Sequence, residues 1–423
     1  VQATATIKNE DGKTTTITAD ATYTPTVVPA VPTAQPAKSI DVQGATQKGK
    51  PTFEGTTVTV NGEQKPVTIK ENSYTLVDKD GNEVTSTPAY AEDGTTVIGT
   101  HTIDPTTGEV TFTPTDKSYS GKVTPVSVQA ESSNGIKVST TYTPEIVPVT
   151  PTAQDAATKD VQGKTQTGKP TFEGGKATVD GVEKTVEIDE DTPATFEDGS
   201  KTKTIPGEGT YTVAPDGTVT FVPEKSFTGK GTGVTVKRVD KNGTEVTAKY
   251  TPTVTPVTPT ATPAESVAPQ GIVQTGTVTF TEGDPVAPIN KETITLLDEN
   301  GQPAASVEAK SPEGKVIGTY TVDKETGVVT FTPTDKSYSG DVVAAKVQAK
   351  DANGTTVETT YTPKITPVTP TAQDAATKDI QGKTQTGTPT FTEGNPLVPI
   401  DEDTPATFED GSKTKTIPGE GTY

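Results

Sequence analysis

The sequence contains no cysteine, methionine or tryptophan, and only one histidine, His101, in 423 residues. Without cysteine the chain forms no disulfide, zinc ribbon, thiol nucleophile or haem attachment motif. A single histidine has no second imidazole with which to share a metal ion, and His101 stands where the other copies of a repeat described below have Tyr. We therefore assign His101 a structural role and predict no catalytic, metal-binding or cofactor-binding residue and no cofactor.

Basic residues and long apolar runs are also scarce. The chain has 56 acidic against 36 basic residues, which gives a formal net charge of -20. Nucleic acids and anionic lipid surfaces are bound by basic patches, so neither is an expected partner. No run of about 18 apolar residues occurs, and no membrane span is predicted.

Hydrophobic residues make up only 29% of the chain, while Thr, Val, Gly and Pro are abundant. Such a composition allows either several small cores or a partly disordered acidic spacer. Thr and Val are β-branched and favour strands, and Gly and Pro favour the turns between them. We expect an all-β protein with little or no helix.

The chain repeats itself at intervals of about 110 residues. A Tyr-Thr-Pro anchor and a Phe anchor recur in the same register, at Tyr23, Tyr142, Tyr250 and Tyr361, and at Phe53, Phe172, Phe280 and Phe391. Two anchors in one register indicate a tandem array. The predicted units are 1–34, the C-terminal hairpin and linker of a preceding repeat; 35–153, 154–261 and 262–372, three complete repeats; and 373–423, the N-terminal part of a truncated repeat.

Each repeat contains strand and hairpin signals. Val and Phe alternate with Thr in three segments that predict a strand with one buried face: 108–114, 217–223 and 327–333. An aromatic residue that follows each strand, Tyr119, Phe227 or Tyr338, is expected to fold back over the edge of the core. Hairpins are predicted at Asn134-Gly135, Asn242-Gly243 and Asn353-Gly354, where both residues tolerate positive φ, and at Asp11-Gly12.

Proline-rich segments separate the repeats. Prolines stand at 144, 148 and 151, and again at 252, 256 and 259 and at 363, 367 and 370. This density favours extended polyproline II spacers that place the domains in line. The alternative is that the segment is an edge strand of the preceding domain.

Several residues were weighed as chemical sites. Asp189-Glu190-Asp191 is better explained as a solvated turn than as an acid/base pair. The turns Asp78-Lys79-Asp80-Gly81-Asn82 and Asp104-Pro105 lack the spaced oxygens and bidentate Glu of an EF-hand, so calcium is disfavoured. Isopeptide bonds within each repeat are conceivable between a lysine and an asparagine, Lys117 with Asn134, Lys225 with Asn242 and Lys336 with Asn353, although Asn-Gly turns already explain these asparagines.

The motifs Gly-Thr-Tyr-Thr-Val, Gly-x-Val-Thr-Phe-Thr-Pro, Val-Gln-Ala-Lys-Asp-Ala-Asn-Gly and Tyr-Thr-Pro-x-x-x-Pro-Val-Thr-Pro-Thr-Ala follow one another in order, most closely at 318–333 and 347–372. In this the chain resembles, over nearly its whole length, the fibril repeats of CshA-type surface adhesins of streptococci and related Gram-positive bacteria. The resemblance implies a secreted, extracellular protein anchored to peptidoglycan through an LPXTG-type signal outside this sequence. It also implies a distal region, likewise outside this sequence, that binds host proteins such as fibronectin.

The resulting interpretation is a rod of small antiparallel β-sandwich-like, Ig-like domains that acts as a stalk and not as an enzyme. Its expected partners are neighbouring repeats of the same chain, and the sequence leaves lateral association with other fibres open. Two alternatives remain open: the repeats themselves bind host protein or glycan, or they form a partly disordered acidic spacer.

Overall fold

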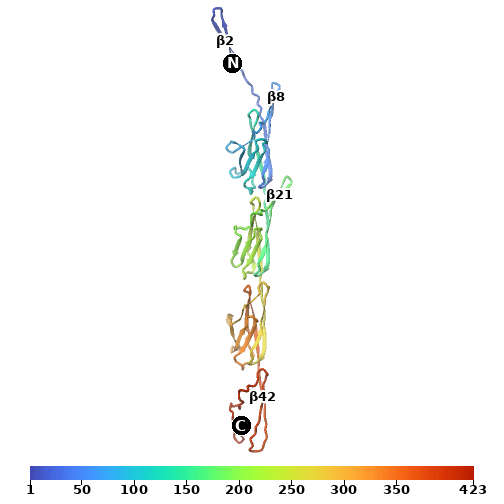
Figure 1. Ribbon diagram of the computed structural model, residues 1–423, viewed down its shortest axis with the longest axis vertical. Helices are drawn as coiled ribbons and strands as arrows, with labels where there is room; N and C mark the ends of the chain where they lie inside the picture. Colours follow the sequence, from blue (N-terminus) through green and yellow to red (C-terminus); the bar gives the residue numbers. More distant parts are fainter.

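The computed structural model describes all 423 residues, and every regular element in it is a β-strand. With no helix, the chain has none of membrane-spanning length. Its folded bodies follow one another along a single axis, with the two termini at opposite ends (Figure 1). The predictions of an all-β fold and of an elongated row of domains are confirmed.

The first complete repeat is built from thirteen strands. They are β3 (Thr33–Gln35), β4 (Ala37–Val42), β5 (Gln47–Gly49), β6 (Thr52–Glu54), β7 (Thr56–Val60), β8 (Glu63–Val67), β9 (Thr75–Val77), β10 (Glu83–Val84), β11 (Ser86–Tyr90), β12 (Val97–Ile103), β13 (Val110–Pro114), β14 (Val126–Glu131) and β15 (Lys137–Val147). Two sheets face each other, in the strand orders β10-β9-β14-β15-β4 and β11-β12-β13-β5.

The second repeat has the same plan. Its strands are β16 (Thr152–Gln154), β17 (Ala156–Val161), β18 (Gln166–Gly168), β19 (Thr171–Glu173), β20 (Gly175–Val179), β21 (Val182–Val186), β22 (Thr195–Phe196), β23 (Thr202–Ile205), β24 (Gly209–Val213), β25 (Val219–Pro223), β26 (Gly229–Lys230), β27 (Val234–Val239) and β28 (Glu245–Thr255). The sheets run β17-β28-β27-β22 and β18-β25-β24-β23.

The third repeat comprises β29 (Thr260–Thr262), β30 (Ala264–Pro269), β31 (Gln274–Thr277), β32 (Thr279–Thr281), β33 (Ile289–Leu297), β34 (Pro303–Ala304), β35 (Ser306–Lys310), β36 (Val316–Val322), β37 (Val328–Pro333), β38 (Gly340–Asp341), β39 (Ala345–Asp351) and β40 (Thr356–Thr366). Outside the three complete repeats lie the hairpin β1 (Gln2–Lys8) with β2 (Thr14–Asp20), and the short strands β41 (Thr371–Gln373), β42 (Thr390–Thr392), β43 (Thr416–Ile417) and β44 (Gly421–Thr422).

A separate core fills the space between the two sheets of each repeat. The predicted strands, now β13, β25 and β37, place Phe112, Phe221 and Phe331 in these cores, each almost fully buried. The tyrosines that mark the period are buried beside them: Tyr142, Tyr250 and Tyr361. The later aromatic of each repeat packs against the edge of the same core, as predicted: Tyr119, Phe227 and Tyr338. Period-2 alternation is therefore sufficient to identify the buried face.

The first half of the proline-rich segment is a strand and not a spacer, so that half of the polyproline prediction is wrong. Residues 142–147 belong to β15 and pair in parallel with β4, with Pro144 opposite Ser39. The same parallel pairing joins β28 to β17 and β40 to β30. Proline fits because this part of the strand lies beyond the antiparallel pairing with β14, which stops at Tyr142. Only residues 148–151 remain outside regular structure at the first junction.

The predicted hairpins form, but their turns differ from the prediction. Gly135, Gly243 and Gly354 have positive φ, whereas the asparagines before them do not. In each turn the glycine N–H donates to the residue three positions earlier, for example Gly243 to Asp240 at 2.8 Å. This is a turn closed by a left-handed glycine, so the asparagine side chain is not needed for the local geometry and is directed outward.

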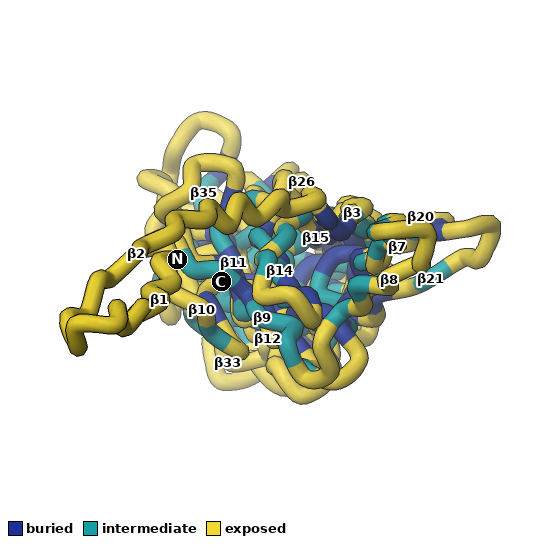
Figure 2. Tube along the Cα trace, turned by 90° about the horizontal axis from the view of Figure 1, so that it is seen from above, coloured by how far each residue is buried: buried dark blue, intermediate teal, exposed yellow.

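Two hairpins with both turn residues at positive φ stand beside the sandwiches. They are β7–β8, which turns at Asn61-Gly62, and β20–β21, which turns at Asp180-Gly181. Viewed along the rod axis they project from the same side of it (Figure 2). The third repeat has no such hairpin, because β33 follows β32 after an irregular segment.

Candidate functional site: the junctions between repeats

A glutamine organises the C-terminal end of each complete repeat, and it is buried in the first two. The backbone N–H of Gln43 donates to Val147 O at 2.9 Å, which joins the end of β4 to the end of β15. The Gln43 side chain donates from Nε2 to Ser118 O at 2.5 Å and accepts from the Val149 N–H at 3.1 Å. One side chain thus fixes the first residues of the linker to the repeat that precedes them.

The second repeat has the same arrangement, and the third has part of it. Gln162 donates to Lys225 O at 2.8 Å and accepts from Val257 N at 3.2 Å. Gln270 is only half-buried and keeps the acceptor bond alone, from Val368 N at 3.0 Å. A buried amide with its donor and acceptor both used is a strong positional constraint, because breaking either bond leaves an unsatisfied polar group.

The asparagine of the following repeat's hairpin completes the junction. Asn242 donates from Nδ2 to Gln43 O at 2.8 Å, and Asn353 donates to Gln162 O at 3.1 Å. Gly44 and Gly163 stand where these asparagines arrive: a Cβ on either would lie 2.2 Å or 2.4 Å from the asparagine Oδ1. The outward-directed asparagines therefore connect successive repeats.

The first junction has an additional apolar contact. Val42 and Val149 are buried against Val179 and Val186 of the β20–β21 hairpin, which belongs to the second repeat. Lys184 of the same hairpin forms an ion pair with Asp41 of the first repeat at 2.6 Å. We call this hairpin and its contacts the brace. Since each well-buried valine contributes on the order of 1.5 kcal/mol, the brace stabilises one relative orientation of the two repeats.

The second junction keeps the glutamine and asparagine contacts but has no brace. The third repeat lacks the hairpin, and Asp160, the counterpart of Asp41, pairs instead with Lys164 of its own repeat at 3.1 Å. Val161 is only half-buried, whereas its counterpart Val42 is buried. The two junctions therefore differ in how firmly they are held.

A family model described as the surface adhesin CshA repetitive domain matches residues 29–146, 148–254, 256–365 and 367–423. The chain belongs to the CshA repeat family. Its four matched segments cover nearly the whole sequence in tandem, which agrees with the resemblance noted from the motifs.

Solved structures of other tandem β-domain proteins are similar to this CshA-repeat chain at low identity. Mouse cadherin-23 EC22-24 is 15% identical over 80% of this chain and 100% of that chain, with a TM-score of 0.30. Titin fragment I67-I69 is 11% identical over 81% and 99%, with a TM-score of 0.29. A tetra-tandem repeat from the extending region of a large adhesion protein is 18% identical over 86% and 81%, with a TM-score of 0.24. No match was found among curated protein sequences.

The acidic turns of the CshA repeats use their carboxylates to cap their own backbone. Asp78 accepts from the N–H groups of Asp80 and Asn82, and the hydrogen bonds from Asn82 lower its pKa. Asp104 accepts from the Thr106 N–H, which lowers its pKa. Asp189 accepts from the Thr192 hydroxyl and the Asp191 N–H, with the same effect on its pKa. No group of three or more His, Cys, Asp or Glu side chains gathers where it could hold a metal ion.

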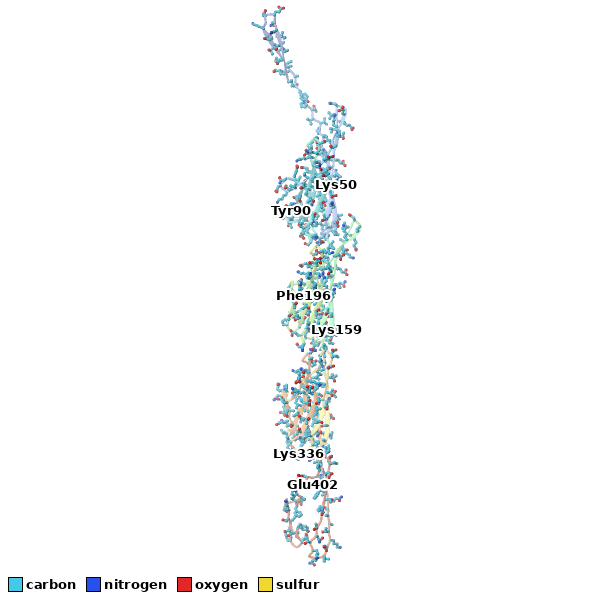
Figure 3. All side chains as sticks on the ribbon, viewed as in Figure 1. Lys50, Tyr90, Lys159, Phe196, Lys336 and Glu402 are labelled. Atoms are coloured by element: carbon cyan, nitrogen blue, oxygen red, sulfur yellow. The ribbon has the colours of Figure 1, made fainter.

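The lysines and asparagines considered for isopeptide bonds lie at opposite ends of each repeat. Lys225 is at the C-terminal end, where its carbonyl accepts from Gln162, while Asn242 of the same repeat contacts the repeat before it. Lys336 likewise lies at the C-terminal end of the third repeat (Figure 3), next to Gly271. The interpretation of these asparagines as turn residues alone was incomplete, because the side chains of Asn242 and Asn353 also bond to the preceding repeat.

The junction glutamines were not singled out from the sequence. A signal was present, because a Gln-Gly pair recurs with the period of the repeat at 43–44, 162–163, 270–271 and 381–382. Its role depends on a residue of the next repeat about 190 to 200 positions away, as in the bond between Asn242 and Gln43. Local pattern alone therefore gives no reason to select it.

We expect removal of the brace to loosen the first junction and leave the second unchanged. The variant combines Lys184→Glu, which places a carboxylate beside Asp41, with Val186→Ser, which removes an apolar contact. Because the chain has no cysteine, spin labels can be placed by Ser139→Cys with Thr247→Cys across the first junction, and by Thr247→Cys with Glu358→Cys across the second. All three positions are exposed and equivalent in the repeats.

The distribution of distances between the two spin labels then measures the range of relative orientations that the repeats adopt at each junction. In the unmodified background the first distribution should be narrower than the second. The brace variant should broaden the first distribution and leave the second as it was. Equal widths at both junctions before the change, or no broadening after it, would show that the brace does not restrain the repeats.

Proposed function

We propose that these repeats form the stalk of a bacterial surface adhesin, which extends from the cell and presents a distal host-binding region. The observation that carries the proposal is the end-to-end junction, in which a hairpin asparagine of one repeat bonds to the Gln-Gly turn of the repeat before it. Such coupling converts small sandwiches into a rod. We also propose that the folded units follow the boundaries 35–153, 154–261 and 262–372, with each unit starting two residues earlier so that β3, β16 and β29 stay whole.

The remaining parts of the proposal concern regions outside this sequence. Secretion, LPXTG-type attachment to the peptidoglycan of a Gram-positive bacterium such as Streptococcus, and binding of a host matrix protein such as fibronectin are assigned to those regions. In support of this division, no aromatic side chain of the complete repeats is fully exposed: nine are buried in the cores, and all but one of the half-buried ones pack against a core. The net charge of -20, spread along the rod, favours separation of neighbouring fibres.

Surface display tests this function. A small binding module is displayed on cells through one, two or three complete repeats, and in parallel through flexible Gly/Ser linkers with the same numbers of residues. Capture of ligand-coated beads should rise with the number of repeats and exceed capture through the matched linker. The repeats displayed without the module should not capture fibronectin-coated beads. Capture by the repeats alone would support the alternative that they are the binding region.

A further inference from the structure

We propose that each repeat bears tension through a clamp formed by its first long strand and its last strand, held by a hydrogen-bond chain that links a buried Tyr to a buried Gln through a half-buried Ser or Thr. This proposal builds on the stalk function, because a stalk carries load between its ends. It concerns a different property, however: the resistance of each repeat to unfolding under force, and not its length or stiffness.

The direction of the terminal strands determines how force acts on them. In the first repeat, β4 and β15 are parallel over six register pairs, from Tyr142 opposite Ala37 to Val147 opposite Val42. Both strands point toward the C-terminal junction, since Gln43 and Val147 are bonded there. The chain enters through the start of β4 and leaves from the end of β15. Tension therefore pulls the two strands past each other along their length.

Shear of this kind loads all six pairs together. An antiparallel hairpin pulled at its adjacent ends opens one pair at a time, so each step costs only a single bond. In a parallel pair pulled at opposite ends, no pair separates until the strands slide as a unit. The arrangement recurs with six pairs between β17 and β28 and six between β30 and β40.

A hydrogen-bond chain crosses this strand pair in the interior of every repeat. In the second repeat the Tyr250 hydroxyl lies 2.7 Å from Thr158 Oγ1, and the Thr158 hydroxyl donates to Gln166 Oε1 at 2.6 Å. Gln166 Nε2 then donates to Thr253 O at 3.0 Å. The counterparts are Ser39, Tyr142 and Gln47 in the first repeat and Ser266, Tyr361 and Gln274 in the third.

This chain joins three strands from both sheets. Thr158 is on β17, Tyr250 and Thr253 are on β28, and Gln166 is on β18 of the opposite sheet. Gln166 and Tyr250 are buried, and burial raises the pKa of Tyr250, so its hydroxyl stays protonated and donates to Thr158. Sliding β17 along β28 breaks both hydrogen bonds of Thr158 at once and leaves the buried Tyr250 and Gln166 without their shared partner.

The close packing over β18 also suits a clamp. The Tyr250 ring covers Gly168, where an added Cβ would lie 2.2 Å from the ring. Gly49 and Gly276 occupy the same place beneath Tyr142 and Tyr361, with corresponding distances of 2.3 Å and 2.4 Å. In the second repeat, the Tyr250 ring therefore packs against β18 of one sheet, while its hydroxyl bonds to β17, the first long strand, in the other sheet.

Single-molecule force spectroscopy on the full chain, held at its two ends, tests the proposal. The unmodified chain should give three unfolding events at similar force, one for each complete repeat. Thr158→Val keeps the side-chain shape and removes the hydroxyl, leaving Tyr250 and Gln166 without their partner. One of the three events should then move to lower force, with an unfolding rate at constant force about 10-fold higher or more.

Two control variants separate the clamp from general stability. Thr158→Ser preserves the hydroxyl, as in the other two repeats, and should leave all three events alike. Val219→Ala shortens a fully buried core residue on β25, outside the terminal pair, and should lower equilibrium stability with a smaller effect on the force. The clamp is refuted if Val219→Ala and Thr158→Val lower the unfolding force of the second repeat by the same amount for the same loss of equilibrium stability. The stalk function would stand in that case.

Discussion

Acidification from pH 7 to pH 4 is expected to destabilise the first complete repeat by about 3 kcal/mol and to change the other two far less. The cause is His101, which is 1% exposed and has no hydrogen-bond partner for either ring nitrogen. It packs against Phe112 and Tyr142, with ring centroids 5.4 Å and 5.9 Å away. Burial lowers the pKa of His101 from 6.5 to about 4.

The sign of the effect follows from proton uptake. The unfolded chain binds a proton at His101 near pH 6.5, while the folded chain does so only near pH 4. Stability from the neutral imidazole is complete above pH 6.5 and is lost as the pH falls toward 4. The strongly shifted carboxylates act in a lower range: hydrogen bonds hold the pKa of Asp93 and of Asp335 at about 2, so their contribution is lost mainly below pH 4.

Hydrogen exchange of the full chain measures the pH dependence of stability separately for each repeat. After correction for the intrinsic rate, protection of β12 and β13 should fall about 100-fold between pH 7 and pH 4, and protection of β24–β25 and β36–β37 far less. His101→Tyr is the matched variant, because Tyr211 and Tyr320 occupy this position in the other repeats and the Tyr320 hydroxyl donates to Val343 O. It should remove the acid sensitivity. If protection of β12 and β13 in the His101→Tyr chain still fell between pH 7 and pH 4 as in the unmodified chain, groups other than His101 would be the cause of the acid sensitivity.

Gly168→Val is expected to destabilise the second repeat by about 3 kcal/mol or more, a large part of the stability of a small domain. The new side chain would meet the Tyr250 ring at 2.2 Å and the Thr158 methyl at 3.2 Å. Since Tyr250 is fully buried, it cannot move without opening the core and breaking its bond to Thr158. Both the overpacking and the lost hydrogen-bond chain contribute to the expected cost.

Limited proteolysis and denaturant unfolding check this result. The second repeat of the Gly168→Val chain should be cleaved while the first and third remain protected. Thr167→Val is the matched control, because it places the same side chain at the neighbouring exposed position of β18 and should be nearly neutral. Resistance of the Gly168→Val chain equal to that of the control would mean that the close approach to Tyr250 does not restrict this position.

The parts of the fold that depend on local pattern could be predicted from the sequence. Alternation of Val and Phe with Thr identified β13, β25 and β37 and their buried aromatics, because a strand with one buried face has a period of two. The hairpins β14–β15, β27–β28 and β39–β40 followed from their turn residues. Each prediction was strengthened by repetition, because the same pattern occurs at the equivalent position of all three repeats.

The parts that depend on distant partners could not be predicted in the same way. The Tyr-Thr-Pro segment was predicted as a spacer from its proline content, but it pairs with a strand that begins about 100 residues earlier in the same repeat. Asn242 was assigned to its turn, although its partner Gln43 lies in another repeat. Gly49, Gly168 and Gly276 gave no local signal, because their function is to admit a tyrosine from the opposite sheet.

Small-angle X-ray scattering of this chain tests the central claim, that its junctions hold the repeats end to end as a rod. With strands of eleven residues spanning each repeat, about 37 Å per repeat is expected from the rise per residue, and a maximum dimension of roughly 150 Å or more for the whole chain. The radius of gyration should then be about 45 Å or larger, well above the ~22 Å of a compact 423-residue protein and below the ~75 Å of an unfolded one. A value near that of the compact protein would mean that the repeats fold back on one another, and a value near that of the unfolded chain would mean that they are not folded; either result would contradict the rod.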